Sequence, residues 1–229
     1  MKYFLLLGVI SSLLFSAELQ PRSVIEASGN VQQVAFVDGN IIAGTSAGTL
    51  EVYKLSDATK LSKIEFPKIK DFTGDEVSPK IFSVDMIEKT LLAVVQATNG
   101  SRELYLVEDG KPKVLIDSKA NLFISKAKFV DKNRILVALL SNEMLLWDVK
   151  NKKEIYRIQP NPSHFSDFAL NESKTMAASS CESGEITLFD ALSGKIIKVL
   201  KGANVDNVYK VDFRNGKVLC AGQDRRGIV

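Results

Sequence analysis

Few side chains in this sequence are suited to acid–base, nucleophilic or metal chemistry. The 229 residues include one histidine, His164, and two cysteines, Cys181 and Cys220. A catalytic nucleophile needs a base beside it, and one histidine without a cysteine or carboxylate cluster makes a weak metal site. The nucleophile-elbow, zinc-protease and phosphate-loop motifs are also missing from the sequence. We therefore predict that the protein is not an enzyme and has no catalytic residue, cofactor or metal site.

The charge balance argues against a nucleic-acid-binding surface. The sequence contains 30 Lys and Arg residues and 27 Asp and Glu residues, so the net charge is +3. The basic residues are spread along the chain among the acidic ones. Nucleic-acid-binding proteins instead gather basic residues on one face. With 45% apolar residues the chain can bury the core of one globular domain. We expect protein partners and no nucleic acid.

The stretch from Phe165 to Leu200 has the pattern of four short β-strands in series. Its apolar side chains alternate with polar ones, and turn signals fall at 171–174, 182–184 and 190–194. Each strand is too short to be stable alone, so we expect the four to form one sheet. We call such a unit a blade.

The same pattern, apolar-x-x-apolar-x-apolar, begins five times at spacings of 50, 43, 41 and 43 residues. Its apolar positions are Val31/Val34/Phe36, Ile81/Val84/Met86, Ile124/Ala127/Phe129, Phe165/Phe168/Leu170 and Val208/Val211/Phe213. A second apolar column follows 19 to 23 residues later: Leu50/Val52/Tyr53, Leu104/Leu106/Val107, Met144/Leu146/Trp147 and Ile186/Leu188/Phe189. A four-strand unit that repeats at this spacing predicts a β-propeller.

The third strands end in Trp147-Asp148 and Phe189-Asp190, where WD40 repeats carry a Trp-Asp dipeptide. The chain therefore resembles a WD40 β-propeller over residues 31–229. The resemblance implies an all-β fold with about four and a half four-stranded blades. The sequence stops inside the third strand of the fifth repeat, so we expect a truncated version of a ring of about seven blades.

Some positions depart from the WD40 pattern. The Gly-His of that family is represented only by Gly202-Ala203 and Ser163-His164. We expect His164 to make a loop hydrogen bond and Trp147 to serve in packing. We also expect Cys181 and Cys220 to be two separate, partly buried thiols, although export would permit a disulfide.

The N-terminal 30 residues carry two further predictions. Residues 1–17 have a basic start, a short apolar run and a small residue before Glu18, which is typical of a secretory signal peptide. Because the run is shorter than a spanning helix needs, we expect a periplasmic product without membrane insertion after cleavage. Residues 18–30 include Val24-Ile25, and the WD40 resemblance implies that they lend a closing strand to the last blade.

Two stretches suggest a narrower function. SPKIFSVD (78–85) and AGQDRR (221–226) resemble the WD40-like accessory proteins of bacterial periplasmic nitrate reductases. This resemblance implies a scaffold or accessory factor for reductase assembly or maturation, with a reductase subunit as partner. LFDALSGK (188–195) is similar to repeats of quinone-dependent dehydrogenases and of outer-membrane assembly factors. The alternative function is therefore that of a quinone-dependent-dehydrogenase-like propeller or an outer-membrane assembly factor. A third alternative is a remnant without stable function.

A partner surface is predicted from the topology of a blade. Connections from fourth to first strands and from second to third strands leave a WD40 blade on the same side. The least repeat-like of them are the insertion between Pro67 and Pro79, the His164 loop and the turn 223–226, and arginine is a preferred interface residue. The predicted partner-binding residues are Asp71, Phe72, His164, Asp224, Arg225 and Arg226.

Overall fold

The computed structural model describes residues 21 and 23–229, so the predicted signal peptide (1–17) lies outside the described residues. Four antiparallel sheets of four strands and one of three follow one another along the chain. Blade 1 contains β1 (Val31–Val37), β2 (Asn40–Thr45), β3 (Thr49–Lys54) and β4 (Lys60–Glu65). Blade 2 contains β7 (Ile81–Ile87), β8 (Thr90–Gln96), β9 (Arg102–Glu108) and β10 (Lys111–Ile116).

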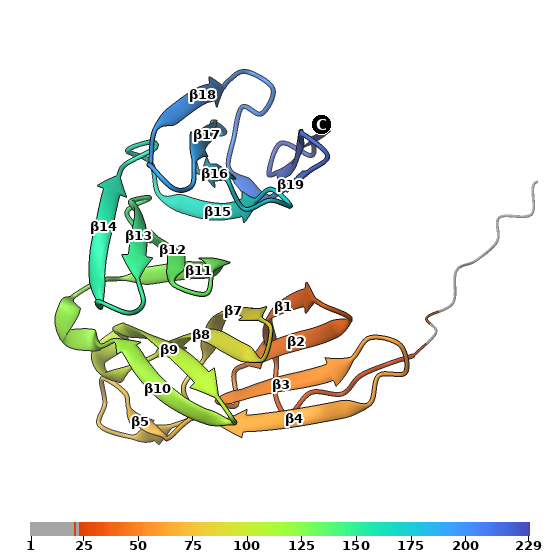
Figure 1. Cartoon of the computed structure of the whole chain (residues 1–229), viewed down its shortest axis with the longest axis vertical. Helices are drawn as coiled ribbons and strands as arrows, with labels where there is room; N and C mark the ends of the chain where they lie inside the picture. Colours follow the sequence, from red (N-terminus) through yellow and green to blue (C-terminus); the bar gives the residue numbers. More distant parts are fainter. Residues whose placement is uncertain (1–20, 22) are drawn as a thin grey trace, which may run out of the picture.

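The remaining blades keep the same order. Blade 3 contains β11 (Ile124–Asp131), β12 (Arg134–Leu139), β13 (Met144–Asp148) and β14 (Lys153–Ile158). Blade 4 contains β15 (Phe165–Leu170), β16 (Met176–Cys181), β17 (Ile186–Asp190) and β18 (Ile196–Leu200). Blade 5 contains β19 (Val208–Arg214), β20 (Lys217–Gly222) and β21 (Gly227–Ile228). The blades stand side by side in an open arc (Figure 1).

Each first strand carries the same irregularity. The register shifts by one residue between the first and third positions of the repeated pattern, for example between Ile81 and Ser83 and between Phe165 and Asp167. The extra residue is a β-bulge, and it lets positions one, four and six share one face of the sheet. Strict alternation would put positions one and four on opposite faces. The bulge therefore explains the apolar-x-x-apolar-x-apolar spacing.

The apolar column packs each blade against the one before it. Four core clusters each combine side chains of two successive blades, and Val84, Ala127, Phe168 and Val211 belong to one cluster each. No described blade precedes blade 1, and there Val34 is 43% and Phe36 66% exposed. The same sequence pattern is thus buried or exposed according to whether a neighbouring blade covers it.

The second apolar column is also mostly buried. Phe189 is fully buried between blades 3 and 4. Trp147 packs against the core between blades 2 and 3 but is only half-buried. Its indole Nε1 is the one buried side-chain nitrogen or oxygen among the described residues that has no hydrogen-bond partner. The packing role expected for Trp147 is confirmed, with a less complete burial than that of Phe189.

Two segments lie outside the blades. The insertion predicted as a loop contains a short hairpin, β5 (Ile69–Lys70) paired with β6 (Glu76–Val77). Residues 23–30 form no strand, so the closing strand expected within 18–30 is not formed there and its pairing stays a prediction. Among the described residues, no helix is long and apolar enough to span a membrane.

Residues 23–30 meet blade 1 at a buried carboxylate. Glu51 is fully buried and accepts hydrogen bonds from the backbone N–H of Ser28 (3.1 Å), Thr49 Oγ1 (2.9 Å) and the Tyr53 hydroxyl. The Lys60 ammonium lies 3.1 Å from it. Burial alone would raise the pKa of Glu51, but these hydrogen bonds outweigh it and lower the pKa to about 2.

Glu51 should make the protein sensitive to acid. Its pKa is lower in the folded than in the unfolded chain, so the unfolded chain binds more protons as the pH falls. The free energy of unfolding should therefore drop between about pH 5 and pH 2, by about 3 kcal/mol from this group. Urea unfolding at several pH values should give a flatter profile for Glu51→Gln than for wild type, with exposed Glu65→Gln as control. Identical profiles for Glu51→Gln and wild type would contradict this prediction.

Candidate protein-binding face

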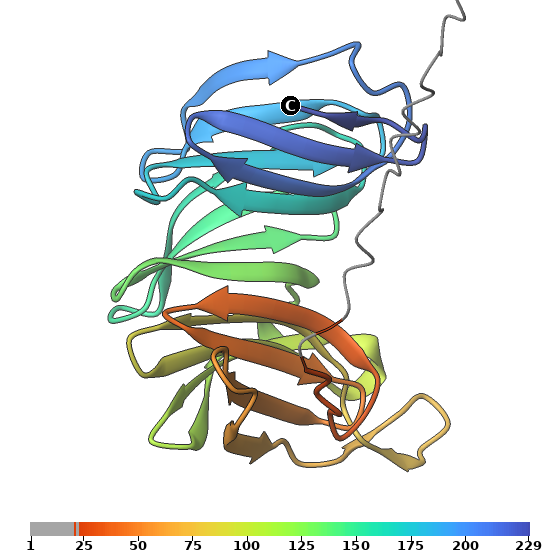
Figure 2. The same cartoon turned by 90° about the vertical axis from the view of Figure 1, so that its right-hand side faces the viewer.

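The strand order gives the arc two different edges. We define the loop face as the edge with the second-to-third and fourth-to-first connections, which include 66–80, 117–123, 140–143, 159–164, 201–207 and 223–226. We define the turn face as the opposite edge, which includes the turns 55–59, 149–152 and 171–175. Figure 2 shows the gold hairpin of residues 66–80 and the blue β18–β19 connection on the same side.

One backbone hydrogen bond organises the loop face in every blade. The residue before each first strand accepts a bond of 2.8–3.1 Å from the N–H of the residue that follows the second strand or ends it. The donor and acceptor pairs are Ser46 and Asn30, Gln96 and Lys80, Leu140 and Phe123, Glu182 and His164, and Gln223 and Asn207. Each bond joins two loop-face connections, so it fixes the backbone positions from which the flanking side chains project.

His164 occupies one of these positions. Its Nδ1 lies 3.1 Å from a carboxylate oxygen of Glu182, and both side chains are exposed. The loop hydrogen bond expected for His164 is therefore present. An exposed histidine beside a carboxylate can contact a partner without any further rearrangement.

The predicted turn 223–226 contains two side chains that bond to a neighbouring loop and one, Arg225, that is exposed without a bond. The Asp224 carboxylate accepts hydrogen bonds from Asn204 Nδ2 (3.1 Å) and the Val205 N–H (3.1 Å), so it orders the neighbouring loop. Arg226 donates to the Ala203 carbonyl at 3.0 Å. Arg225 is exposed, has a positive φ of 63° and makes no hydrogen bond or ion pair with the described residues. Arg225 is the side chain of this turn that is available to a partner.

The hairpin tip likewise has one side chain that orders the turn and one that is exposed to solvent. Asp71 accepts hydrogen bonds from the N–H groups of Thr73 (2.9 Å) and Asp75 (3.0 Å), which closes the turn. The hydrogen bonds from Thr73 also hold the pKa of Asp71 below its usual value. Phe72 is 90% exposed. Within the described residues, no hydrogen bond or ion pair joins the hairpin tip to His164 or to the turn 223–226, so these are three separate places on one face.

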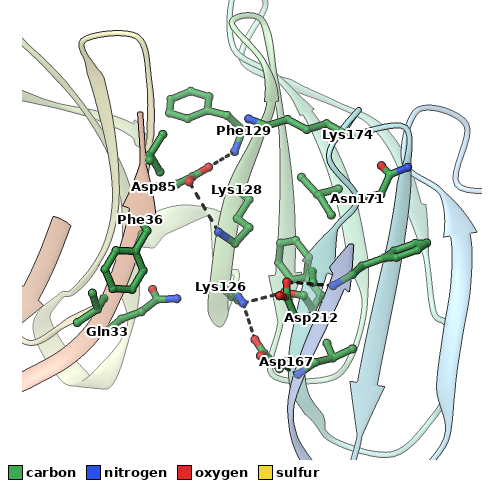
Figure 3. Close-up of a pocket in the computed structure, with 18 of the residues that line it drawn as sticks. Gln33, Phe36, Asp85, Lys126, Lys128, Phe129, Asp167, Asn171, Lys174 and Asp212 are labelled. Carbon is green, nitrogen blue, oxygen red and sulfur yellow. Dashed lines mark hydrogen bonds and ion pairs between the residues drawn. The ribbon is translucent and has the colours of Figure 1, made fainter. Parts of the chain in front are cut away.

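A central channel of about 700 Å³ runs between the first strands of the five blades (Figure 3). Its polar lining comes largely from residues at the third and fifth positions of the repeated pattern, which the bulge places opposite the apolar column. These include Gln33, Asp85, Lys126, Lys128, Asp167, Lys210 and Asp212.

The polar side chains of the first strands link each blade to the next. Gln33 Oε1 accepts from the Val84 N–H (2.7 Å), Asp85 from the Phe129 N–H (2.8 Å), and Asp167 from the Val211 N–H (3.2 Å). At the remaining junction, Lys126 Nζ donates to Asp167 (2.5 Å) and to the Phe168 carbonyl (2.7 Å). These contacts were not predicted from the sequence, because the third and fifth positions of the repeated pattern vary in residue type from blade to blade.

Three of the four lysines that line the channel lie close to carboxylates. Lys126 and Asp167 form an ion pair with side chains only 12% and 4% exposed, and Figure 3 shows them facing each other. Lys128 lies 3.7 Å from Asp85, and Lys210 lies 3.7 Å from Asp167. Burial lowers the pKa of Lys126 to about 8, although Asp167 acts in the opposite direction. These ion pairs therefore join first strands of neighbouring blades, and they leave Lys174 as the channel lysine without a carboxylate partner among the described residues.

The described part of the chain holds no group of three or more histidine, cysteine or carboxylate side chains placed to bind a metal. Cys181 and Cys220, both described and both buried, are not joined by a disulfide. Cys181 Sγ lies 3.1 Å from Ser183 Oγ, and Cys220 Sγ lies 3.0 Å from Asn204 Oδ1. The expectation of two separate thiols is confirmed.

Comparison with solved structures identifies the fold. The β-propeller domain of Cps50 (Swd1) from Myceliophteria thermophila aligns with a TM-score of 0.68 and 17% identity, over 87% of this chain and 64% of that one. The chain has a β-propeller fold. The computationally designed Ika8 protein aligns with a TM-score of 0.60 and 15% identity, over 85% of this chain and 56% of that one.

The propeller thus spans between half and two thirds of the length of each of these two structures. No family model matches the chain, and no curated protein is similar to it in sequence. At such low identity the two structures establish the fold and nothing about partners.

Proposed function

We propose that this propeller is a non-catalytic scaffold that binds a partner protein through the loop face. The observation that carries the proposal is the distribution of exposed apolar side chains among the connections. The loop-face connections contain four large, exposed apolar residues: Phe72, Phe123, Leu140 and Val205. The described turn-face connections contain one, Leu55. Exposed apolar groups concentrated on one face are typical of protein-binding surfaces.

The composition of the face favours a protein partner over a small ligand. Arg225 and His164 add polar groups around the apolar positions, and arginine is enriched where interfaces gain most of their affinity. In the channel, in contrast, Lys126, Lys128 and Lys210 are already paired with carboxylates. The proposed role therefore rests on loop contacts and requires no cofactor.

The narrower form of the proposal is an exported accessory factor whose partner is a subunit of a periplasmic nitrate reductase. It is supported by residues 1–17 and by the stretches 78–85 and 221–226. Arg225 lies within the second of these stretches and on the loop face, so the narrower proposal and the general one share a residue. Recovery of the reductase with the tagged protein from a periplasmic fraction would support it, and recovery only from cytoplasm would contradict the export.

Charge reversal gives a direct test of the face. Arg225→Glu should lower recovery of the partner from an extract of the source cells about tenfold, because arginine is enriched among the interface residues that contribute most to affinity and the variant also reverses the charge. The melting temperature should not change, since the Arg225 side chain is exposed and makes no hydrogen bond or ion pair with the described residues.

Lys150→Glu/Lys152→Glu is the matched control, because both lysines are exposed in a turn-face connection. It should leave recovery unchanged. If the control abolishes recovery while Arg225→Glu does not, the partner binds the turn face and the proposal is wrong.

A further inference from the structure

Blade 3 departs from the other blades at the hydrogen-bonded pair on the loop face. In blade 3 the pair is Phe123 and Leu140, which are 50% and 39% exposed. In the other four blades both positions are polar: Asn30 and Ser46, Lys80 and Gln96, His164 and Glu182, Asn207 and Gln223. Since the backbone bond is the same in all five, blade structure does not require apolar side chains here.

An arginine is hydrogen-bonded to the backbone next to Phe123. Arg102 begins β9 in blade 2, and its Nη1 donates to the carbonyl of Ile124 at 2.8 Å, the residue next to Phe123. Its guanidinium carbon lies 3.9 Å from the ring centroid of Phe82, so the planar group stacks on an aromatic face. The arginine is thus held in one position at the junction of blades 2 and 3.

Arg102 has no carboxylate partner among the described residues. Arg134, Arg157, Arg214 and Arg226 each lie within 3.8 Å of an Asp or Glu oxygen. Arg102 is half-buried, and burial lowers the pKa of its guanidinium. Its Nε and Nη2 make no hydrogen bond with the described residues. Neither nitrogen is fully buried, since Trp147 Nε1 is the one buried side-chain atom there without a partner. A stacked, immobilised guanidinium with open donors is suited to bind an oxygen anion.

Resting on the proposed scaffold function, we propose that Arg102, Phe123 and Leu140 bind an extended segment of the partner protein with an Asp or Glu side chain beside an apolar residue. The carboxylate of that segment pairs with the open N–H groups of Arg102. The apolar side chain covers Phe123 and Leu140, which removes apolar surface of both proteins from water. Stacking on Phe82 limits the side-chain entropy that Arg102 loses on binding.

Selection from a display library of random twelve-residue peptides tests this chemistry. The peptides are fused at their C-terminal ends, so any carboxylate that they offer comes from a side chain. Selection on the wild-type protein should enrich peptides with an acidic residue next to an apolar one. The enriched sequences are then synthesised with amidated ends, and their dissociation constants are measured.

Arg102→Gln should weaken binding of such a peptide about tenfold, and Arg102→Lys should weaken it less, because lysine keeps the charge without the planar fork. Phe123→Ser and Leu140→Ser test the apolar part at exposed positions where the fold tolerates polar residues, and each should weaken binding about fivefold. Leu55→Ser on the turn face is the matched control and should bind like wild type.

Three outcomes would overturn the inference: no enrichment of acidic–apolar peptides, unchanged binding by folded Arg102→Gln together with Phe123→Ser, or equal loss in the Leu55→Ser control. Synthetic peptides that bind only with a free C-terminal carboxylate would also contradict it, since the proposal requires a side chain. Any of these results would leave the scaffold proposal standing, provided that Arg225→Glu still reduces partner recovery.

Discussion

Lys126→Met should lower the free energy of unfolding by about 3–5 kcal/mol, the range found when one partner of a buried ion pair is removed. Lys126 and Asp167 have side chains only 12% and 4% exposed, and the lysine also donates to the Phe168 carbonyl across the junction of blades 3 and 4. The variant leaves the Asp167 carboxylate buried without its main cation. Chemical denaturation followed by far-ultraviolet circular dichroism measures the loss.

A double variant separates the cost of leaving Asp167 buried without its cation from the stability that the Lys126–Asp167 pair itself contributes. Lys126→Met/Asp167→Asn should recover most of the lost stability, because the amide oxygen of asparagine can still accept from the Val211 N–H. Lys132→Met is the matched control, since Lys132 and Glu88 form an exposed pair expected to contribute less than about 1 kcal/mol. Equal losses for Lys126→Met and Lys132→Met would show that the channel ion pair does not hold the blades together.

Phe189→Ala should lower the free energy of unfolding by about 3–5 kcal/mol, as expected for a buried phenylalanine. Its ring is fully buried in the core between blades 3 and 4. Trp147→Ala should cost less, although it occupies the same column one blade earlier, because Trp147 is only half-buried.

Trp147→Phe is the informative comparison. It removes an indole N–H that is buried without a partner, and such a group costs about 1–3 kcal/mol. The variant should therefore be close to wild type in stability, measured by the same denaturation experiment. A loss for Trp147→Phe as large as that for Phe189→Ala would contradict this account of the column.

The repeat pattern allowed the five blades and their apolar columns to be predicted, because burial on one side of a strand shows directly in the choice of residue. Val84 and Ala127 are buried where the pattern places them. Val34 and Phe36 have the same pattern but are exposed, since burial also depends on the neighbouring blade.

The contacts between blades could not be read from the pattern. Asp85 bonds to the backbone of Phe129, 44 residues later, and that pairing depends on how two blades sit against each other. The available signal was that the third and fifth positions of the repeat are mostly polar or charged although they lie on core strands. Likewise, Phe123 and Leu140 stood out only when the structure aligned the corresponding loop positions of all five blades.

Photo-crosslinking tests most directly whether a partner protein binds the loop face. A benzophenone side chain is placed at position 72 or 140 on the loop face or at position 55 or 152 on the turn face. On irradiation in the source cells, we expect one discrete crosslinked protein from positions 72 and 140 and none from positions 55 and 152. Crosslinks confined to positions 55 and 152, or equal in yield from both faces, would contradict the account.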